Sequence, residues 1–181
     1  MTTTLPITQL KPGSPGYPAS LGNCGPDLYA RGNLRLLERS LVGVFSSVRA
    51  SGAAVLRAIQ WARTVAKDSI GIVSGFHAPL EQECLGLFLR NGVPAIVCVA
   101  REIAAYRVPS AWRPALDAGN LLLLTSFAAE RRVTSATSQI RNQIVVSLAN
   151  EIVILHAEPG SKTDCLAQEV ATRGKPLRWL G

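Results

Sequence analysis

Short apolar runs alternate with amphipathic segments along most of this chain. Apolar runs predict strands at 42–45, 70–73, 95–99, 120–124 and 152–155, with a short sixth at 176–179. Helical spacing of apolar residues predicts helices at 52–67, at 80–90, around 140–148 and after residue 163. The run 152–155 is uninterrupted and rich in β-branched residues, which is typical of a strand buried on both faces. This alternation predicts βαβ units, and therefore a three-layer α/β fold in which helices flank a mostly parallel sheet.

The first 33 residues follow neither pattern. They contain five prolines, at positions 6, 12, 15, 18 and 26, together with several glycines. Such a composition predicts an extended lead-in that packs on the domain and does not fold alone. We therefore divide the chain into residues 1–33, the lead-in, and residues 34–181, a single α/β domain. A chain of this size can bury roughly 70% of the surface that it exposes when unfolded.

The charge balance adds an expectation about partners. The formal net charge is +7, and 15 of the 19 basic residues are arginine, whose planar guanidinium pairs bidentately with phosphate. A basic surface of this kind favours anionic partners, with nucleic acid first among them. Arg31, Arg35 and Arg39 recur at four-residue spacing. That spacing fits a basic helical stripe that contacts phosphates, and it fits a solvated helix face equally well.

Composition and spacing exclude several classes of protein. Hydrophobic residues make up 48% of the chain and charged residues 17%, which is far from the composition of disordered proteins. We find neither a signal-peptide pattern nor an apolar run of membrane-spanning length, so we expect a cytoplasmic protein with no membrane partner. His77 and His156 lack a ligand-like spacing to the four cysteines. We therefore expect no metal site, and no motif indicates a cofactor.

The loops after the predicted strands carry the candidate chemistry. In parallel sheets, ligands bind beyond the carboxyl ends of the strands, and small polar residues and arginines gather in these loops. The segment Glu158–Thr163 opens a predicted helix, where backbone N–H groups and the helix dipole favour a phosphate. The same residues also fit an ordinary helix N-cap. They lack the spacing of a Walker A motif, so nucleotide hydrolysis is unsupported.

Four segments in the same order resemble one family. Tyr17–Leu21 with Leu28–Asn33 matches its opening signature, and Ile72–Gly75 matches its V-S-G strand end. Arg141–Ile144 is similar to its R-N-R-I helix, and Gly160–Thr163 to its S-G-S-x-x-T-A phosphate loop. The family is the DNA-processing protein A family (DprA or Smf). The resemblance runs from about residue 17 to residue 181 and implies a Rossmann-like fold, in the superfamily that also holds the lysine-decarboxylase-like phosphoribohydrolases.

The chain departs from the family pattern in two loops. Where the family has V-G-S-R, this chain has Phe45–Val48, with an arginine only at Arg49. The S-G-x-A-x-G-I-D motif becomes Ser74–Glu81 and loses a glycine. The winged-helix domain that follows in many members is expected to be absent. We therefore interpret the chain as a divergent, core-only member.

The resemblance implies a function and a set of site residues. Members bind single-stranded DNA through a basic pocket and load a recombinase onto it, without known catalysis, and the resemblance also implies a homodimer. Carried over to this chain, the phosphate-binding residues are Ser46, Ser47, Arg49, Ser51, Ser74, Gly75, Arg141, Asn142, Gly160, Ser161, Lys162 and Thr163. Arg141 also fits a solvated helix residue that pairs with Glu151 or Glu158.

Two alternatives stay open. The phosphoribohydrolases use a P-G-G-x-G-T-x-x-E loop, and Pro159–Thr163 is similar to its beginning, but Leu166 stands where the catalytic glutamate is required. We find no paired carboxylates, no Ser-His-Asp set and no Cys-His pair, so we expect no catalytic residues and no enzyme. The second alternative is a sensor that binds a free nucleotide or a nucleotide-derived signal in the same pocket.

Overall fold

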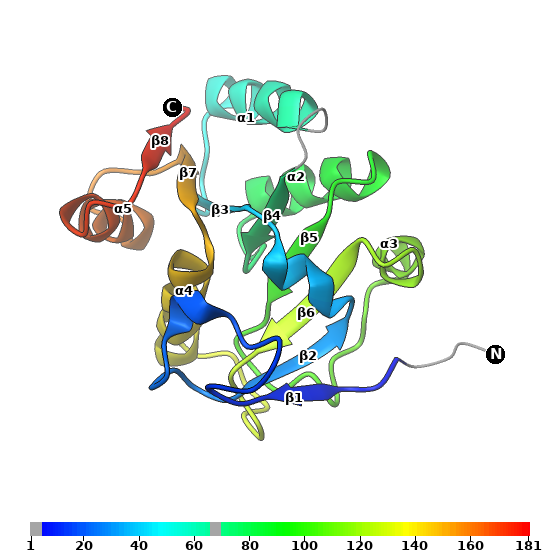
Figure 1. The fold of residues 1–181 in the computed structure, drawn as a ribbon. Coiled ribbons are helices and arrows are strands. Elements are labelled where there is room, and N and C mark those ends of the chain that lie inside the picture. Colours follow the sequence, from blue (N-terminus) through cyan, green and yellow to red (C-terminus); the bar gives the residue numbers. More distant parts are fainter. Residues whose placement is uncertain (1–4, 66–69) are drawn as a thin grey trace.

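A single mixed sheet forms the centre of the molecule (Figure 1). The computed structural model describes residues 5–65 and 70–181. In these residues the sheet has eight strands in the order β1-β2-β6-β5-β4-β3-β7-β8. The strands are β1 (Thr8–Leu10), β2 (Leu28–Gly32), β3 (Leu41–Ser46), β4 (Gly71–Ser74), β5 (Ala95–Cys98), β6 (Leu121–Thr125), β7 (Glu151–His156) and β8 (Leu177–Trp179).

The strands from β3 to β8 are parallel, and their order creates a switch point. From β3 the chain moves outward through β4, β5 and β6, and it then returns to place β7 on the other side of β3. The loops that follow β3 and β7 therefore leave the sheet side by side and diverge toward opposite faces. In open α/β sheets this is where ligands bind, so the topology alone selects these two loops.

Helices cover both faces of the sheet. They are α1 (Gly52–Val65), α2 (Pro79–Arg90), α3 (Arg113–Asp117), α4 (Ser135–Leu148) and α5 (Lys162–Thr172), with short 3-10 helices η1 (Ala19–Leu21), η2 (Leu34–Glu38) and η3 (Ser110–Trp112). Side chains of α1, α2 and α3 join one hydrophobic core, and those of α4 and α5 join the other. The mostly parallel, Rossmann-like α/β fold expected from the sequence is confirmed.

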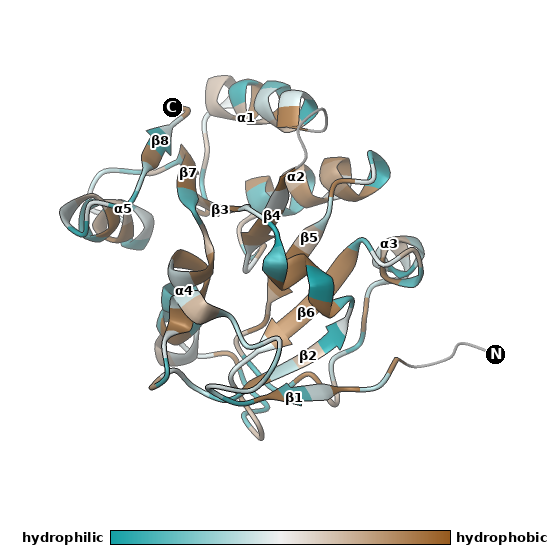
Figure 2. Ribbon diagram, in the orientation of Figure 1, coloured by the Kyte–Doolittle hydropathy of each residue, from teal (hydrophilic) through white to brown (hydrophobic). Residues whose placement is uncertain are grey.

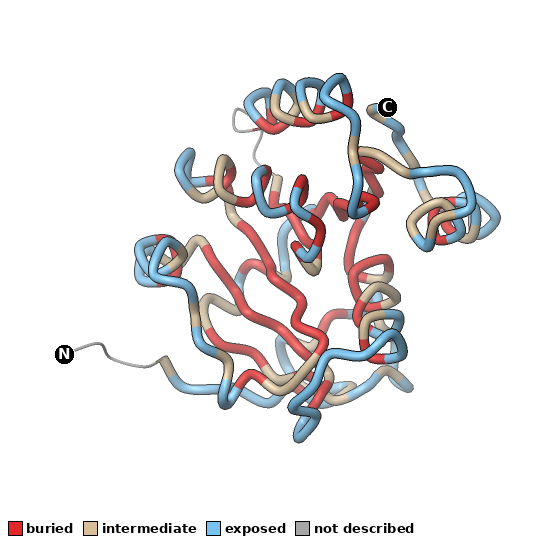
Figure 3. Tube along the Cα trace, turned by 180° about the vertical axis from the view of Figure 1, so that it is seen from behind, coloured by how far each residue is buried: buried red, intermediate tan, exposed pale blue. Residues whose placement is uncertain are grey.

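Each inner strand supplies both cores by alternation. In β3, Val42 and Val44 face the α1–α2 side, whereas Leu41 and Phe45 face the α4–α5 side. Figure 2 shows that the central strands are mostly apolar and that the helices carry both apolar and polar residues. Figure 3, which views the molecule from behind, shows the same strands as buried. The four apolar residues of the run 152–155 have no exposed surface. The prediction of a strand buried on both faces is therefore correct.

The lead-in contributes two strands that the sequence pattern did not predict. β2 pairs antiparallel with β6, placing Ala30 opposite Leu124, and β1 pairs antiparallel with β2. Leu28 is completely buried. Between the two strands the chain crosses to α4, where η1 packs (Figure 1). This segment therefore extends the sheet of the domain as well as packing on its surface.

Two further expectations differ from the structure. Arg31, Arg35 and Arg39 form no helical stripe, because Arg31 lies in β2, Arg35 in η2 and Arg39 just after it. The predicted helix 52–67 is α1, which is described to Val65, and residues 66 and 67 lie outside the described part of the chain. Within the residues that the structure describes, none of the helices is long and apolar enough to cross a membrane.

Candidate functional site

A cavity of about 660 Å³ lies at the switch point. It is bounded by the carboxyl ends of β3 and β4, the segment after β7, and the first turns of α4 and α5. Nine of the twelve residues that the sequence assigned to phosphate binding line it. They are Ser46, Ser47, Ser74, Gly75, Arg141, Asn142, Ser161, Lys162 and Thr163. The topology has thus brought together residues that are more than a hundred positions apart in the chain.

The loops after β3 and β7 are joined through Ser47. Its backbone N–H donates to the carbonyl of His156 at 2.8 Å, and its hydroxyl accepts from the backbone N–H of Glu158 at 3.1 Å. The Ser47 and Ser161 hydroxyl oxygens are 2.9 Å apart. Ser47 is only 4% exposed. Its hydroxyl therefore holds the two loops in register, and the Ser161 end of the pair lies on the cavity wall.

The first turns of two helices meet at this cavity. The Ser161 hydroxyl caps α5 by accepting from the N–H of Asp164, and the Thr134 hydroxyl caps α4 by accepting from the N–H of Thr137. A helix leaves its first N–H groups without partners inside the helix, and its dipole is positive at that end. Lys162 donates from Nζ to the Ser135 hydroxyl at 2.8 Å and so links the two turns. This side of the cavity is suited to an anion.

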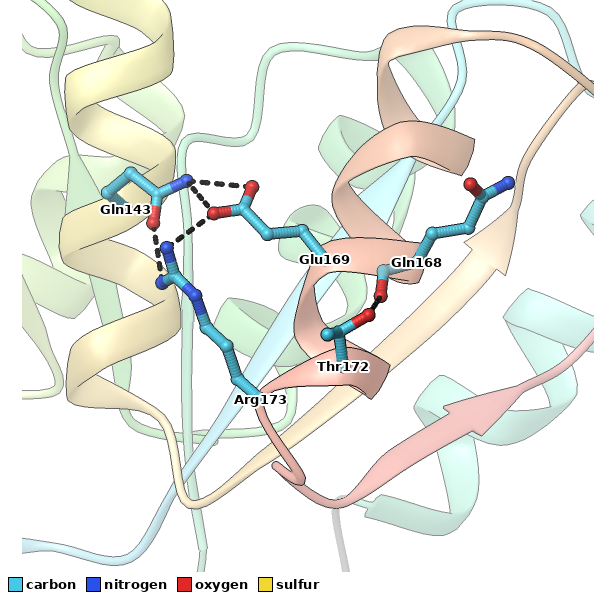
Figure 4. Close-up of polar contacts among 5 residues, drawn as sticks. All are labelled: Gln143, Gln168, Glu169, Thr172 and Arg173. Carbon is cyan, nitrogen blue, oxygen red and sulfur yellow. Dashed lines mark hydrogen bonds and ion pairs between the residues drawn. The ribbon is translucent and has the colours of Figure 1, made fainter.

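A polar brace holds α5 against α4 farther along the two helices (Figure 4). Gln143 of α4 donates from its amide to the Glu169 carboxylate at 3.2 and 3.3 Å. Arg173, just after α5, donates to the Gln143 amide oxygen at 2.9 Å and pairs with Glu169. Each of the three side chains therefore contacts both of the others. The brace fixes the relative position of the two helix N-termini that face the cavity.

Arg141 is a buried cation at the centre of the site. It is 8% exposed, and its Nε donates to the Asn142 side-chain oxygen at 2.7 Å. Among the described residues, its terminal amino groups donate to no protein acceptor and no carboxylate lies within 4 Å. Burial lowers the pKa of Arg141, an effect that the charge of Glu81 opposes. The alternative of a solvated Arg141 that pairs with Glu151 or Glu158 is wrong, because Arg141 is buried and neither carboxylate lies within 4 Å of it.

Gly75 makes room for this guanidinium. A Cβ atom at position 75 would overlap with Nη1 and Cζ of Arg141. Both residues line the switch-point cavity and also a neighbouring cavity of about 450 Å³. The wall of that neighbour includes Tyr106 and Trp112, and the Arg101 guanidinium lies 5.2 Å from the centroid of the Tyr106 ring. Arg141 therefore stands between a polar cavity and one with aromatic walls.

Glu81 is a buried carboxylate that the sequence analysis did not assign to the site. One oxygen accepts from the backbone N–H of Ser46 at 2.8 Å, and the other accepts from those of His77 and Ala78 at 2.8 and 3.3 Å. It thereby ties the end of β3 to the start of α2. Burial raises the pKa of Glu81, although these three N–H groups and Arg141 act in the opposite direction.

This shift predicts a pH dependence of stability. Because the folded state holds the Glu81 proton more tightly than the unfolded state, the wild-type free energy of unfolding should fall, relative to Glu81→Gln, as the pH rises above about 4.5. Below that value the difference between the two proteins should be constant. Urea titrations at a series of pH values measure it, with Glu83→Gln, an exposed position of the same helix, as the charge-matched control. A difference that grows with pH would mean that the three N–H donors and Arg141 outweigh burial.

A family model supplies the decisive comparison. The model for DNA recombination-mediator protein A matches residues 8–179, which is nearly the whole chain. The chain belongs to this family. The match includes the lead-in from Thr8 and both helices at the switch-point cavity, so the resemblance noted from separate motifs holds over the entire fold. A comparison by sequence with curated proteins found no significant match.

Solved structures of DNA processing protein A share the fold. The protein from Streptococcus pneumoniae superposes with a TM-score of 0.81 at 19% identity, covering 96% of this chain and 62% of that one. The protein from Helicobacter pylori superposes with a TM-score of 0.76 at 20% identity, covering 97% of this chain and 80% of that one. That structure was described for its single-stranded DNA binding mode. This chain thus spans about three fifths of the Streptococcus protein. The molybdenum cofactor carrier protein of Chlamydomonas reinhardtii is more distant, with a TM-score of 0.52 at 12% identity, covering 78% and 76%.

Three of the residues that the sequence assigned to phosphate binding in this chain lie off the cavity wall. Arg49 is exposed in the loop after β3, and the Ser51 hydroxyl accepts from the N–H of Ala54 at the start of α1. Gly160 is exposed, with φ +74°, and its N–H donates to Asp164 at 2.8 Å. Gly160 therefore shapes the turn before α5, while Ser51 stabilises the start of α1.

The wall also contains residues that the sequence analysis missed. Besides Glu81, the polar ones are His77, Thr134, Ser135, Ser138 and Glu158. Three of them belong to the beginning of α4. A capping signal was present, since Thr134 and Thr137 satisfy each other's first-turn groups. The apolar periodicity of this helix begins only at Ile140, so the polar first turn was not recognised as part of it.

Proposed function

We propose that this protein binds single-stranded DNA, without converting it chemically, through the switch-point cavity. The observation that carries the proposal is Arg141, a buried guanidinium with open terminal amino groups on the cavity wall. Burying a cation is unfavourable unless an anion or hydrogen-bond acceptors compensate it. A phosphate in the cavity would supply both. Membership of a recombination-mediator family, and the single-stranded DNA that the Helicobacter pylori relative binds, support DNA as the source of that phosphate.

The position of the phosphate follows from the charges on the wall. Arg141 and Lys162 are opposed by Glu81 and Glu158, so the cavity is not uniformly positive. Glu81 lies at the start of α2, which makes that end unfavourable for an anion. The first N–H groups of α4 and α5 lie at the other end of the cavity, beside Ser135 and Lys162, with which these helices begin. We therefore place the phosphate between Arg141 and the first turns of these two helices.

Two of the carboxylates near the cavity, those of Glu169 and Glu81, are held by the protein itself. Leu166 occupies the wall where a phosphoribohydrolase requires its glutamate. Glu169 is engaged by Gln143 and Arg173, and Glu81 accepts three backbone N–H groups. A general acid or base must be able to reach a substrate proton, and these two carboxylates are committed to the protein. Binding without turnover is therefore the function that the geometry supports best.

The aromatic walls of the neighbouring cavity favour a free nucleotide as the second candidate. Tyr106 and Trp112 line that cavity on the far side of Arg141, where a base could stack while its phosphate contacts the guanidinium. A mononucleotide that competes fully with the DNA strand at equal phosphate concentration would favour this candidate. A strand that binds far more tightly than the mononucleotide would favour DNA.

Titration of a fluorescent oligonucleotide of about 30 residues across salt concentrations tests the proposal. We expect affinity to fall steeply with salt. Lys162→Ala should weaken binding about tenfold and reduce the salt slope by about 0.7, as expected when one phosphate contact to a single strand is lost. Arg90→Ala removes the same charge from the last turn of α2, at the amino ends of the parallel strands, and should have little effect.

Absence of binding by the parent protein at low salt, or equal effects of the two substitutions, would contradict the proposal.

We also propose, from the family description as a recombination mediator, that a recombinase receives the bound strand. The homodimer implied by the resemblance is likewise a proposal. Light scattering at micromolar concentration tests it, and a monomer mass would remove it.

A further inference from the structure

A third cavity, of about 360 Å³, lies away from the switch point beside β2. Its wall is formed by β2, by the segment between β5 and α3, and by α3, on the face of the sheet that α1 and α2 cover. Its polar lining consists of Arg31, Arg107, Arg113, Asp117 and the ring of Tyr106. Its volume lies within the range of small-molecule and nucleotide sites. The site described above uses none of these residues except Tyr106, which lies on the shared wall.

Arg31 is the buried cation of this cavity. It is 7% exposed although it lies in a strand next to the sheet edge. Its Nη2 donates to the carbonyls of Ile103 and Ala104, at 2.9 and 3.5 Å, while its buried Nε has no hydrogen-bond partner. Within residues 5–65 and 70–181, no carboxylate lies within 4 Å of it. The two carbonyls compensate this buried guanidinium in part, and an anion in the cavity would complete the compensation.

Two exposed arginines complete the charge of the cavity. Arg107 precedes η3 and Arg113 begins α3, and both reach the same wall as Arg31. Neither forms an ion pair with any described residue. Against these three guanidinium groups the wall has one carboxylate, that of Asp117. Arginine forks match the oxygens of phosphate in geometry as well as in charge.

The rest of the wall is apolar. Leu5, Val108 and Leu116 contribute aliphatic surface, and Tyr106 contributes a half-buried ring. A simple inorganic ion would use only the arginine side of such a cavity. A nucleotide would use both sides, because its phosphate would contact the arginines while its sugar or base packed against the apolar residues.

The three cavities are connected through shared walls. Gly75, His77, Val133 and Arg141 line both the switch-point cavity and the one with aromatic walls. Tyr106 lines both the aromatic cavity and the arginine cavity beside β2. The series therefore runs from Lys162 past Arg141 and Arg101 to Arg107, Arg113 and Arg31. Its walls are formed by the loops after the parallel strands and the first turns of α4 and α5, and by β2 and α3 at the far end.

We infer that the arginine cavity beside β2 binds a second phosphate, with its nucleoside, farther along the same single strand that enters the switch-point cavity. This inference rests on the proposed function and adds a second subsite to it. The strand would pass over the aromatic cavity between the two phosphate sites. Strands too short to span the three cavities would then use only the first site.

Two oligonucleotides of different length test the inference. One of about 4 residues fills a single site and one of about 30 spans the series, given the usual 4–16 residues per binding domain. Binding to each is measured by fluorescence anisotropy across salt for the parent and for Arg107→Ala/Arg113→Ala. Both positions are exposed, so the fold should persist. Arg63→Ala/Arg90→Ala removes equal charge from the last turns of α1 and α2, at the amino ends of the parallel strands, and serves as the control.

We expect the Arg107→Ala/Arg113→Ala protein to bind the long strand about tenfold more weakly, with a salt slope lower by about 0.7. Its affinity for the short strand should equal that of the parent, and the control should match the parent with both strands. An unchanged affinity for the long strand, or equal losses for both lengths, would overturn the inference while leaving the proposed function in place. A parent protein that binds neither strand would remove the proposed function and this inference with it.

Discussion

Gly75→Ala should lower the affinity for single-stranded DNA at least tenfold while leaving the fold intact. The new Cβ would overlap with the end of the Arg141 side chain, which can swing aside because it is long and flexible. The backbone is therefore spared, but the guanidinium would leave the position between the two cavities. Hydrogen bonds to charged groups contribute about 1.5–3 kcal/mol each, which corresponds to roughly tenfold to a hundredfold in affinity. Anisotropy titration with a 30-residue strand measures the loss.

Gly86→Ala provides the matched control for this variant. Gly86 also faces an arginine, Arg90, but its Cβ would lie at an ordinary 3.5 Å from that side chain. Alanine inside α2 should be neutral or stabilising by about 1 kcal/mol, because it favours the helix. Its DNA affinity should match the parent. Equal affinity of the Gly75→Ala protein and the parent would show that the position of Arg141 does not determine binding.

Gly32→Ala should have the largest effect on stability, a loss of about 3 kcal/mol or more. Gly32 ends β2 with φ +123°, a conformation that side chains strongly disfavour, and a Cβ there would overlap with the carbonyl oxygen of Leu121. It would also lie 3.1 Å from Leu116 Cδ1 and 3.2 Å from Leu122 Cα. Two of these three neighbours are backbone atoms, so relief requires β2 to move away from β6. The melting temperature should fall by roughly 6–12 °C for a chain of this size.

Gly13→Ala separates the two causes of this effect. Gly13 also has a positive φ, +78°, but a Cβ there meets no atom within 4 Å. The free energy of unfolding of the Gly13→Ala protein should therefore fall only by the cost of the backbone conformation, about 1 kcal/mol. Thermal unfolding followed by circular dichroism compares the two variants. If both melt at the same temperature, the contact between β2 and β6 is looser than the structure indicates.

The sequence predicted the parallel core well because its signals are local. Each inner strand consists mostly of buried apolar residues, and four of the helices are 11–14 residues long, so the loops after the strands could be assigned from the sequence. The antiparallel strands β1 and β2 were missed because Thr8–Leu10 and Leu28–Gly32 are short and lie among prolines and glycines. What makes Leu28–Gly32 a strand is its neighbour β6, which lies more than eighty residues later.

The candidate site was predicted in part for the same reason. Serines and glycines after strands could be located from the pattern, and the family resemblance added Arg141 and Asn142. The dependence of Arg141 on the bare backbone of Gly75 could not be predicted, because nothing in the sequence says that these two residues meet. The burial of Glu81 also depends on tertiary packing, since an acidic residue early in a helix is most often a solvated one.

The Glu81 carboxylate also explains what the loss of a glycine after β4 does to the molecule. Pro79 stands at the first position of α2 and has no N–H to offer, and the N–H groups of His77 and Ala78 already donate to Glu81. The start of this helix is therefore already occupied by an acceptor from the chain itself, the Glu81 carboxylate. Protonation of Glu81 would not free these N–H groups, because its oxygens would remain beside them. Under the proposed function, an incoming phosphodiester would therefore be bound by the first turns of α4 and α5 and not by that of α2.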